Sequence, residues 1–363
     1  MSLEKLNSIV KTAGVDAIAL IPSANLHFVT GQEFHLMERP LVVFFKPGQD
    51  PVAVLPALEQ DRMADSPVPC QLVPWTDSEG YEGAFEAAAA AFSPPLAKIG
   101  VEEMVMRIFE ANLIETAFPG VRIVPAGDAL AGLRMHKDAN ALAAMREAVR
   151  ISEAALQATL DTVQPGMTER EITNILVQAQ LQRGGGKNPF EPIVLSGPRS
   201  ALPHGEPSDR AVQAGEPLLL DFGTTVHGYA SDITRTVCVG QPSDKLAEVY
   251  SIVQQANAAG RAAVQPGVTA EEVDRITRAV IEDAGYGAYF THRTGHGLGL
   301  ETHELPNIVA GNATVLEPGM TFTIEPGIYL PGELGVRIED NVVVTTDGAE
   351  SLTTFPRDLM SIG

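Results

Sequence analysis

The chain has 363 residues, of which 45% are hydrophobic and 20% are charged, a composition typical of a globular protein with two domains. The 25 Lys and Arg against 46 Asp and Glu give a net charge of −21, which argues against nucleic acid and anionic membranes as partners. Only two cysteines occur, which excludes a disulfide framework and a Cys-based zinc site. Because the sequence has neither a signal-peptide pattern nor an apolar run long enough to span a membrane, we expect a cytoplasmic location.

Residues 1–128 alternate helical and strand patterns and predict an α/β domain. In chain order, the patterns predict a helix over 3–13, strands over 17–21, 41–45, 52–55 and 99–101, a helix over 104–112 and a strand over 121–124. This region contains no obvious catalytic constellation. Pro125-Ala126-Gly127 marks the boundary, and we expect a second domain over 129–363.

The second domain begins with a long amphipathic helix and then repeats itself. Apolar residues recur at helical spacing at Leu142, Met145, Val149, Leu156 and Leu160. Segment 163–172 matches segment 264–273 at an offset of 101 residues. Each copy carries Thr-x-x-Glu after Pro-Gly, which is the capping-box pattern of a helix start. The repeat predicts an internal duplication into two α+β halves packed with pseudo-twofold symmetry.

Each half continues with an apolar strand that ends on a carboxylate and a return strand that carries another. The first pair is Asp221 and Asp232, and the second pair is Glu325 and Glu339. Four carboxylates that converge near the symmetry axis repel one another unless cations lie between them. Two divalent ions about 3.5–4 Å apart would neutralise them. Arg337 lies two residues before Glu339 on the same strand face, so we expect it to orient that carboxylate.

The positions of the turns set which carboxylates face each other. A turn centred between Val226 and His227 would place the two aspartates opposite each other, and a turn centred on Gly332 would do the same for the two glutamates. Directly opposed residues on one sheet face have Cβ atoms about 5 Å apart. A β-bulge would shift either register by one residue.

A histidine between glycines offers a further metal ligand. His296 lies in the segment Gly-His-Gly-Leu-Gly, where the glycines let neighbouring backbone come close while the imidazole stays accessible. Three other imidazoles lie in nearby motifs, at His204, His292 and His303.

Taken together, the motifs resemble those of the pita-bread metallopeptidases, and within them the Xaa-Pro branch of prolidase and aminopeptidase P. The resemblance covers 129–363, and the N-terminal region resembles the creatinase-type domain of that branch. It rests on Pro203-His204-Gly205, Asp221-Phe222-Gly223, Ser231-Asp232-Ile233-Thr234-Arg235-Thr236, Gly295-His296-Gly297, His303-Glu304, Ile324-Glu325-Pro326-Gly327 and Val336-Arg337-Ile338-Glu339-Asp340. The implied fold is an α/β creatinase-like N-terminal domain followed by an α+β pita-bread catalytic domain with an internal pseudo-twofold duplication.

The resemblance also implies a role for each motif residue. The five metal ligands would be Asp221, Asp232, His296, Glu325 and Glu339. The histidines on the substrate side would be His204, His292 and His303. In that scheme Glu325 also moves a proton, His204 and His303 stabilise the tetrahedral intermediate, His292 contacts substrate and Arg337 supports the ligands. Such an oxygen-rich set suits Mn²⁺, with Co²⁺ and Zn²⁺ as alternatives.

The implied activity is dinuclear metal-dependent hydrolysis of Xaa-Pro bonds in short peptides by a homodimer, and we favour an Xaa-Pro dipeptidase. The first alternative is an Xaa-Pro aminopeptidase (aminopeptidase P) that acts on longer peptides. A more distant one is a non-catalytic binding module of the same fold, although such a module would be expected to have lost ligands. The large N-terminal domain argues against methionine aminopeptidase, and the complete ligand set argues against creatinase.

The length of the substrate depends on how its C-terminal end is recognised. A dipeptidase must bind the free carboxylate of the terminal proline. Arg39, in the segment 34–40, carries a planar guanidinium suited to a carboxylate. One hypothesis is that Arg39 caps the site and selects dipeptides. The alternative is that Arg39 pairs with Glu38 or with another surface acid.

Overall fold

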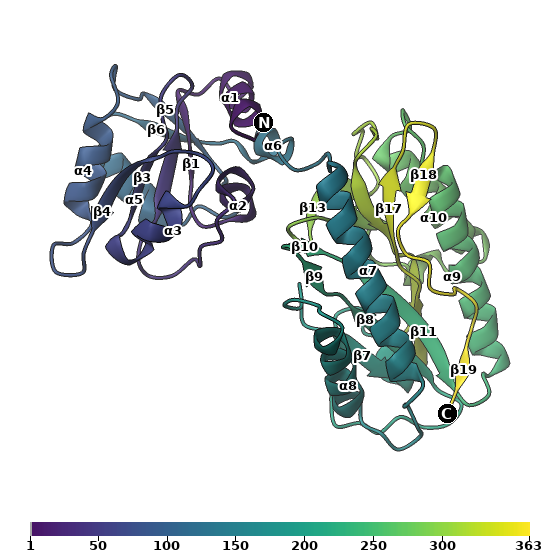
Figure 1. The fold of residues 1–363 in the computed structure, drawn as a ribbon. Coiled ribbons are helices and arrows are strands. Elements are labelled where there is room, and N and C mark those ends of the chain that lie inside the picture. The colour runs from purple at the N-terminus through teal and green to yellow at the C-terminus, as the bar shows by residue number, and fades with distance from the viewer. Residues whose placement is uncertain (1) are drawn as a thin grey trace. The chain divides into compact units, whose positions relative to one another are not determined.

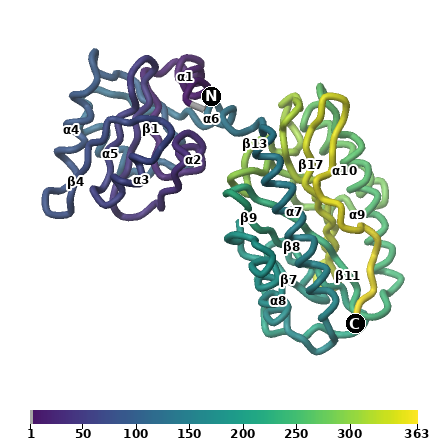
Figure 2. Tube along the Cα trace, viewed as in Figure 1, coloured from purple at the N-terminus to yellow at the C-terminus, as the bar shows by residue number. Residues whose placement is uncertain are grey.

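The computed structural model describes residues 2–363. The chain divides into two compact units, Met1–Arg134 and Met135–Gly363 (Figures 1 and 2). Over the described residues, no helix combines the length and the apolar composition needed to cross a bilayer.

Unit 1 is built on a mixed sheet of strand order β4-β3-β2-β1-β5-β6. Its strands are β1 Ala17–Leu20, β2 Val42–Phe45, β3 Val52–Pro56, β4 Gln71–Trp75, β5 Lys98–Val101 and β6 Arg122–Pro125. Its helices are α1 Ser2–Thr12, α2 Ala24–Thr30, α3 Gln60–Ala64, α4 Glu82–Ala90, α5 Ile108–Ala117 and α6 Gly127–Ala131, with a 3₁₀ turn over Ala57–Glu59. Along β1, Ala19 packs into one core cluster and Ile18 into another, because successive side chains point to opposite, helix-covered faces.

The predicted strands of this unit are confirmed to within a residue at each end, but the helix predicted over 104–112 is wrong at its start. Residues 102–106 form a turn instead, in which the amides of Val105 and Met106 both bond to the carbonyl of Glu102. Helix α5 begins only at Ile108, after Arg107 in an extended conformation. Apolar residues at helical spacing do not distinguish this short turn from the first turn of a helix.

Unit 2 consists of two halves, each of which begins with two helices and continues with strands. The first half contains α7 Ala139–Leu160, α8 Glu169–Gln182, β7 Ile193–Ser196, a 3₁₀ turn Gly197–Ala201, β8 Pro217–Phe222, β9 Thr225–Val226, β10 Tyr229–Ala230 and β11 Ile233–Val239. The second contains α9 Asp244–Ala263, α10 Ala270–Asp283, a 3₁₀ turn Gly287–Tyr289, β12 Gly295–Gly297, β13 Glu304–Ile308, β14 Thr321–Ile324, β15 Gly327–Leu330, β16 Leu334–Arg337 and β17 Asp340–Val344. Strands β18 Ala349–Ser351 and β19 Ser361–Ile362 complete the chain and pair with β17 and β11.

The structure confirms the internal duplication. Helix α7 packs on α8, and α9 packs on α10, which lie side by side in Figure 1. Equivalent bridges join Thr168 to Ala211 in the first half and Thr269 to Val315 in the second. The predicted capping box forms at α8, where Thr168 and Glu171 bond reciprocally. It does not form at α10, because the Glu272 carboxylate binds the Arg275 guanidinium instead.

Candidate metal centre

Unit 2 contains a cavity of about 640 Å³, a volume in the usual range for small-ligand sites. All of its lining residues belong to unit 2. The structure brings together in this cavity every site residue predicted from the sequence in that unit, namely His204, Asp221, Asp232, His292, His296, His303, Glu325, Arg337 and Glu339.

The four carboxylates lie where strands of the two halves meet. Asp221 is in β8, and Asp232 directly precedes β11. Glu325 directly follows β14, and Glu339 lies between β16 and β17. The halves are joined at this point, since the amide of Glu339 donates to the carbonyl of Thr234 in β11 over 3.1 Å.

In the first hairpin, the predicted opposition of Asp221 and Asp232 is wrong. Asp221 pairs with Thr234 in the antiparallel register, which puts Asp232 two residues away along the return strand. The turn lies at His227 and Gly228, one residue later than predicted, and both have positive φ, 49° and 82°. This is the type I′ geometry that favours Gly in two-residue hairpins. The two aspartates are therefore diagonal neighbours, still within reach of a common ion.

In the second hairpin, the prediction is confirmed. Strands β14 and β17 pair Ile324 with Asp340, and β15 and β16 pair Gly327 with Arg337. Both pairs lie in the register that places Glu325 opposite Glu339. The turn is centred on Gly332, whose φ of 76° suits glycine.

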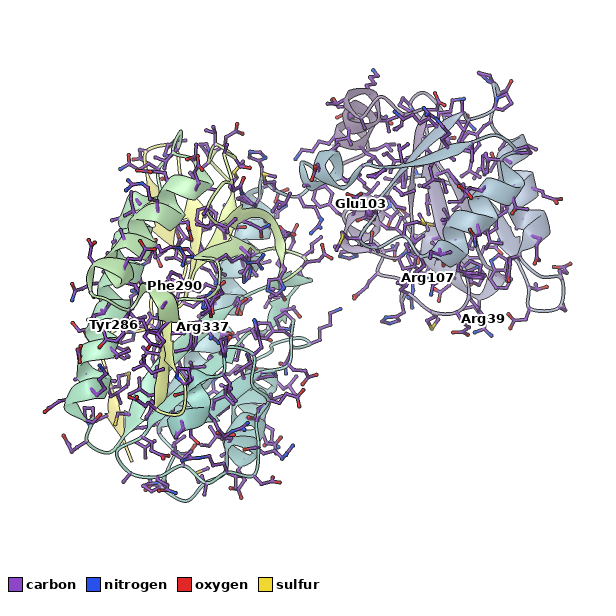
Figure 3. The ribbon with its side chains drawn as sticks, turned by 180° about the vertical axis from the view of Figure 1, so that it is seen from behind. Arg39, Glu103, Arg107, Tyr286, Phe290 and Arg337 are labelled. Carbon is purple, nitrogen blue, oxygen red and sulfur yellow. The ribbon has the colours of Figure 1, made fainter. Side chains whose placement is uncertain are left out.

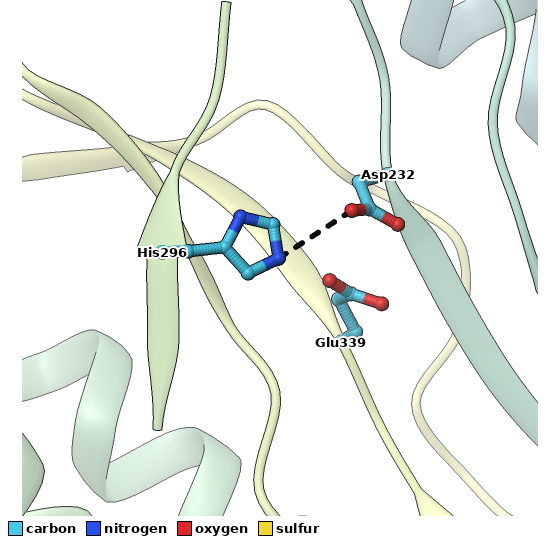
Figure 4. Close-up of side chains that lie close together, drawn as sticks. All are labelled: Asp232, His296 and Glu339. Carbon is cyan, nitrogen blue, oxygen red and sulfur yellow. Dashed lines mark ion pairs between the residues drawn. The ribbon is translucent and has the colours of Figure 1, made fainter. Parts of the chain in front are cut away.

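The imidazole of His296 points at these carboxylates from β12 (Figure 4). Its Nε2 lies 3.3 Å from Oε1 of Glu325 and 3.6 Å from Oδ2 of Asp232. One ligand atom from each of Asp232, His296 and Glu339 lies within 4.8 Å of the other two. A cluster of this size matches the reach of a single cation.

The glycines beside His296 are required by the close approach of its neighbours. A Cβ on Gly295 would lie 1.8 Å from the carbonyl oxygen of Thr323, and one on Gly297 would lie 2.4 Å from that of Leu305. Strand β12 thus fits between β13 and β14 only without side chains at these positions. The sequence prediction that glycines permit this approach is confirmed.

Arg337, which is labelled in Figure 3, contacts a different carboxylate from the one predicted. Its guanidinium donates to Oδ2 of Asp221 at 2.5 Å, to the hydroxyl of Tyr329 at 2.7 Å and to Oγ1 of Thr234 at 3.1 Å. Glu339 instead accepts from Oγ1 of Thr234 at 2.6 Å. The other oxygen of Asp221, Oδ1, is buried without a hydrogen-bond partner within residues 2–363.

The electrostatics of the site favour cations. Burial and the neighbouring carboxylates raise the pKa of Asp232 and of Glu339 well above their ordinary values. Burial likewise raises the pKa of Glu325 to about 7, despite the opposing charge of Arg337. Burial lowers the pKa of His296 to about 3, so its imidazole is neutral and able to act as a ligand at neutral pH. These closely spaced carboxylates lie beside a neutral imidazole, and Oδ1 of Asp221 has no hydrogen-bond partner among the described residues. Such a set of side chains is suited to binding hard divalent ions.

The remaining histidines surround this cluster. The ring of His303 lies 4.3 Å from that of His296, edge to face, and His204 is exposed at the cavity wall. His292 is fixed by 2.8 Å contacts of its Nε2 with the Tyr329 hydroxyl and of its Nδ1 with the Arg293 carbonyl. Burial, assisted by Arg337, lowers the pKa of His292 to about 3.

Arg39 lies in unit 1 and pairs with surface acids, which is the alternative interpretation given for it from the sequence. Its guanidinium donates to both carboxylate oxygens of Asp77, at 3.0 and 2.8 Å, and to Glu38 at 2.8 Å.

The sequence analysis missed two polar residues of the cavity region. Tyr329 joins His292 to Arg337 through its hydroxyl, and Arg293 lines the cavity directly. Arg293 follows His292 in the His-Arg-Thr-Gly-His-Gly motif, so its position next to two recognised histidines was an available signal. Tyr329 carries no local signal, because its role depends on strand pairing.

Comparison with known proteins identifies the family. The profile of Metallopeptidase family M24 matches residues 143–346, and that of the Creatinase/Prolidase N-terminal domain matches residues 3–136. The chain belongs to metallopeptidase family M24. Its pita-bread catalytic unit and creatinase-like N-terminal unit confirm the fold class expected from the sequence.

Relatives within M24 match along their whole length. The Xaa-Pro dipeptidase of Lactobacillus delbrueckii subsp. lactis is 36% identical, covering 99% of this chain and 98% of its own. The structure of dipeptidase PepE from Mycobacterium ulcerans has a TM-score of 0.91 at 37% identity, covering 99% and 97%. That of X-Pro aminopeptidase from Thermotoga maritima has a TM-score of 0.86 at 31% identity, covering 99% of each chain. Membership of M24 makes this chain a metallopeptidase that uses divalent metal and acts on peptides.

Proposed function

We propose that this chain is a metal-dependent Xaa-Pro dipeptidase. The observation that carries the proposal is the buried cluster of Asp232, His296 and Glu339 at a cavity of about 640 Å³, in a chain that aligns end to end with a named Xaa-Pro dipeptidase. The complete set of acidic and imidazole side chains argues against a non-catalytic binding module.

The residues proposed to hold two divalent ions are Asp221, Asp232, His296, Glu325 and Glu339. Four carboxylates and one imidazole favour Mn²⁺, with Co²⁺ and Zn²⁺ as alternatives. The raised pKa values of Asp232 and Glu339 support this assignment, because burial and the neighbouring carboxylates disfavour their ionised forms unless a cation compensates the charge.

When bound, such ions supply Lewis acidity and lower the pKa of the water that attacks the peptide carbonyl. Glu325 is placed to accept a proton from that water at Oε1 and to deliver it to the proline nitrogen that leaves. His303 and His204, on the cavity wall, donate hydrogen bonds to the oxygen on which negative charge develops. Arg337 holds Asp221 in position over 2.5 Å.

A second candidate is an Xaa-Pro aminopeptidase, favoured by the full-length similarity to the Thermotoga maritima structure. The two activities differ at the C-terminal side of proline, where a dipeptide ends in a carboxylate and a longer peptide continues as an amide. Hydrolysis of Ala-Pro and of Ala-Pro-Ala by the Mn²⁺-loaded enzyme separates them. We expect Ala-Pro to be the better substrate. Preferential cleavage of Ala-Pro-Ala would support the aminopeptidase, and cleavage of neither would refute both.

A homodimer is also proposed, from the family resemblance alone. Light scattering after size-exclusion chromatography tests it directly. We expect twice the chain mass of 38.6 kDa, and the mass of a single chain would contradict it.

A further inference from the structure

Helix α9 carries a polar residue, Asn257, in the middle of its apolar face. The side chain is fully buried. At the 101-residue offset of the internal repeat, its counterpart in α7 is Leu156, which is buried in an apolar core cluster. Three turns earlier on the same face both helices are apolar, with Met145 in α7 and Leu246 in α9. A buried amide costs free energy unless its hydrogen bonds are made, so the bonds of Asn257 show what distinguishes the second half from the first.

The amide nitrogen of Asn257 contacts the main chain beside two proposed metal ligands. Nδ2 donates to the carbonyl of Ile324 at 3.1 Å and to the carbonyl of Ile338 at 3.2 Å. These carbonyls belong to the peptide groups that lead into Glu325 and Glu339. Because an amide nitrogen carries two N–H donors, one side chain ties the two peptide groups to each other and to α9.

Both peptide groups are also held at their other ends. The N–H of Glu325 donates to the carbonyl of Thr294 at 2.8 Å, and that of Glu339 donates to the carbonyl of Thr234 at 3.1 Å. A peptide group is planar, so bonds to its carbonyl oxygen and to its N–H together fix the Cα atom that follows. Main-chain bonds therefore set the points from which the two glutamate side chains project.

Neighbouring residues of α9 fix the orientation of the amide and the position of the helix. Nε of Arg261 donates to Oδ1 of Asn257 at 2.8 Å, which leaves Nδ2 facing the two carbonyls. A Cβ on Gly260 would lie 2.4 Å from Oγ1 of Thr277 and 3.0 Å from Cγ2 of Ile324. The absence of a side chain at Gly260 thus lets α9 come close enough to β14 for the amide to reach its carbonyls.

We propose that Asn257 is a positioning residue that holds Glu325 and Glu339 at the separation needed to bind divalent metal. The inference rests on the proposed function, in which both glutamates are ligands. Neighbouring carboxylates repel each other when no cation lies between them, so a metal-free site without this tie would relax apart. A tie that exists before metal arrives removes the cost of bringing the ligands together.

The test is a titration of Mn²⁺ into the chelated protein, with bound metal measured directly, for the parent and for Asn257→Leu. This substitution installs the residue type of the equivalent position in α7, which has a similar size and no N–H donor. Loss of a group that orients metal ligands typically costs about 10- to 100-fold in metal affinity, and we expect a loss in that range.

The matched control is Val249→Ala, at another fully buried position of α9. Removing buried methyl groups lowers the stability of the fold, so this variant should unfold at a lower Tm than the parent after chelation. Its Mn²⁺ affinity should be unchanged. A merely structural role of Asn257 would make the two variants alike, with metal affinity following Tm in both.

A second variant covers the case in which Asn257→Leu is poorly folded. Asn257→Asp keeps the shape of the amide and the bond from Nε of Arg261, whose charge matches the new carboxylate. It presents an oxygen instead of N–H donors to the carbonyls of Ile324 and Ile338. We expect it to lose Mn²⁺ affinity as Asn257→Leu does. Glu339→Gln, which removes a proposed ligand itself, is the reference for ligand loss.

Unchanged Mn²⁺ affinity in Asn257→Leu or in Asn257→Asp, or an equal loss in Val249→Ala, would overturn the inference while leaving the proposed function intact. If the parent binds no Mn²⁺, or if Glu339→Gln binds it as tightly as the parent, the proposed ligand set is wrong and the inference fails with it.

Discussion

Glu325→Gln should stabilise the metal-free protein while it abolishes activity. In the native protein, Glu325 lies among other carboxylates, and burial raises its pKa to about 7 from an ordinary value of 4.5. The neutral amide has nearly the same shape and can still accept the 3.2 Å hydrogen bond from Oγ1 of Thr323. The substitution therefore removes a buried charge without creating a cavity.

The magnitude follows from the linkage between protonation and folding. Each pKa unit corresponds to about 1.4 kcal/mol, so the shift of Glu325 corresponds to about 3 kcal/mol. Below pH 4.5 the carboxyl is protonated in both folded and unfolded chains, and the variant has no advantage. As the pH rises through 4.5 to 7, the unfolded chain releases its proton first, and the folded parent loses stability. Above pH 7 the whole difference is present.

The assay is thermal unfolding after exhaustive chelation, at pH 4.5 and at pH 8. For a domain of 150–250 residues, 1 kcal/mol shifts Tm by about 2–4 °C, so we expect Glu325→Gln to unfold about 6–12 °C higher than the parent at pH 8. The control is Glu333→Gln, which makes the same chemical change at an exposed position in the β15–β16 turn. It should leave Tm unchanged at both pH values.

Mn²⁺ should stabilise the parent strongly and Glu325→Gln weakly, so that the order of stability reverses. Equal Tm values for the metal-free parent and variant at pH 8, or a difference that does not shrink at pH 4.5, would refute the account of this carboxylate.

Three further outcomes are expected. Asp232→Ala should lower bound metal and reduce turnover by several orders of magnitude, and full metal occupancy with near-normal turnover would contradict its role. His204→Ala and His303→Ala should keep the metals but lose about 10²- to 10⁴-fold in kcat; loss of metal with an unchanged rate per bound ion would make either one a ligand. Arg337→Met should weaken metal binding through Asp221, measured by Mn²⁺ titration, and unchanged affinity would show that their 2.5 Å contact is dispensable.

Much of the fold could be predicted because it depends on local patterns. Strand and helix periodicities located most elements, and the repeated Pro-Gly and Thr-x-x-Glu segments revealed the duplication that the bridges at Thr168 and Thr269 confirm. The same pattern failed in detail at Thr269. There Glu272 is held by Arg275, one turn along the helix, and this competition between partners is not visible in the motif.

The site residues were predictable as a set, whereas their contacts were not. The turn at His227 and Gly228 shifts the first hairpin, and only the requirement for positive φ at two successive residues distinguishes it from its neighbours. The partner of Arg337 depends on how the two halves meet, which brings Asp221 rather than Glu339 to its guanidinium. Long-range pairing of this kind leaves no periodic signal in the sequence.

The most direct test of the central claim is a titration of Mn²⁺ into the chelated enzyme, with bound metal and Ala-Pro hydrolysis measured on the same samples. The account predicts negligible hydrolysis without metal, a rise in activity as ions bind, and saturation at two ions per chain. Full activity in the chelated enzyme would contradict it, as would two bound ions per chain without hydrolysis of Ala-Pro.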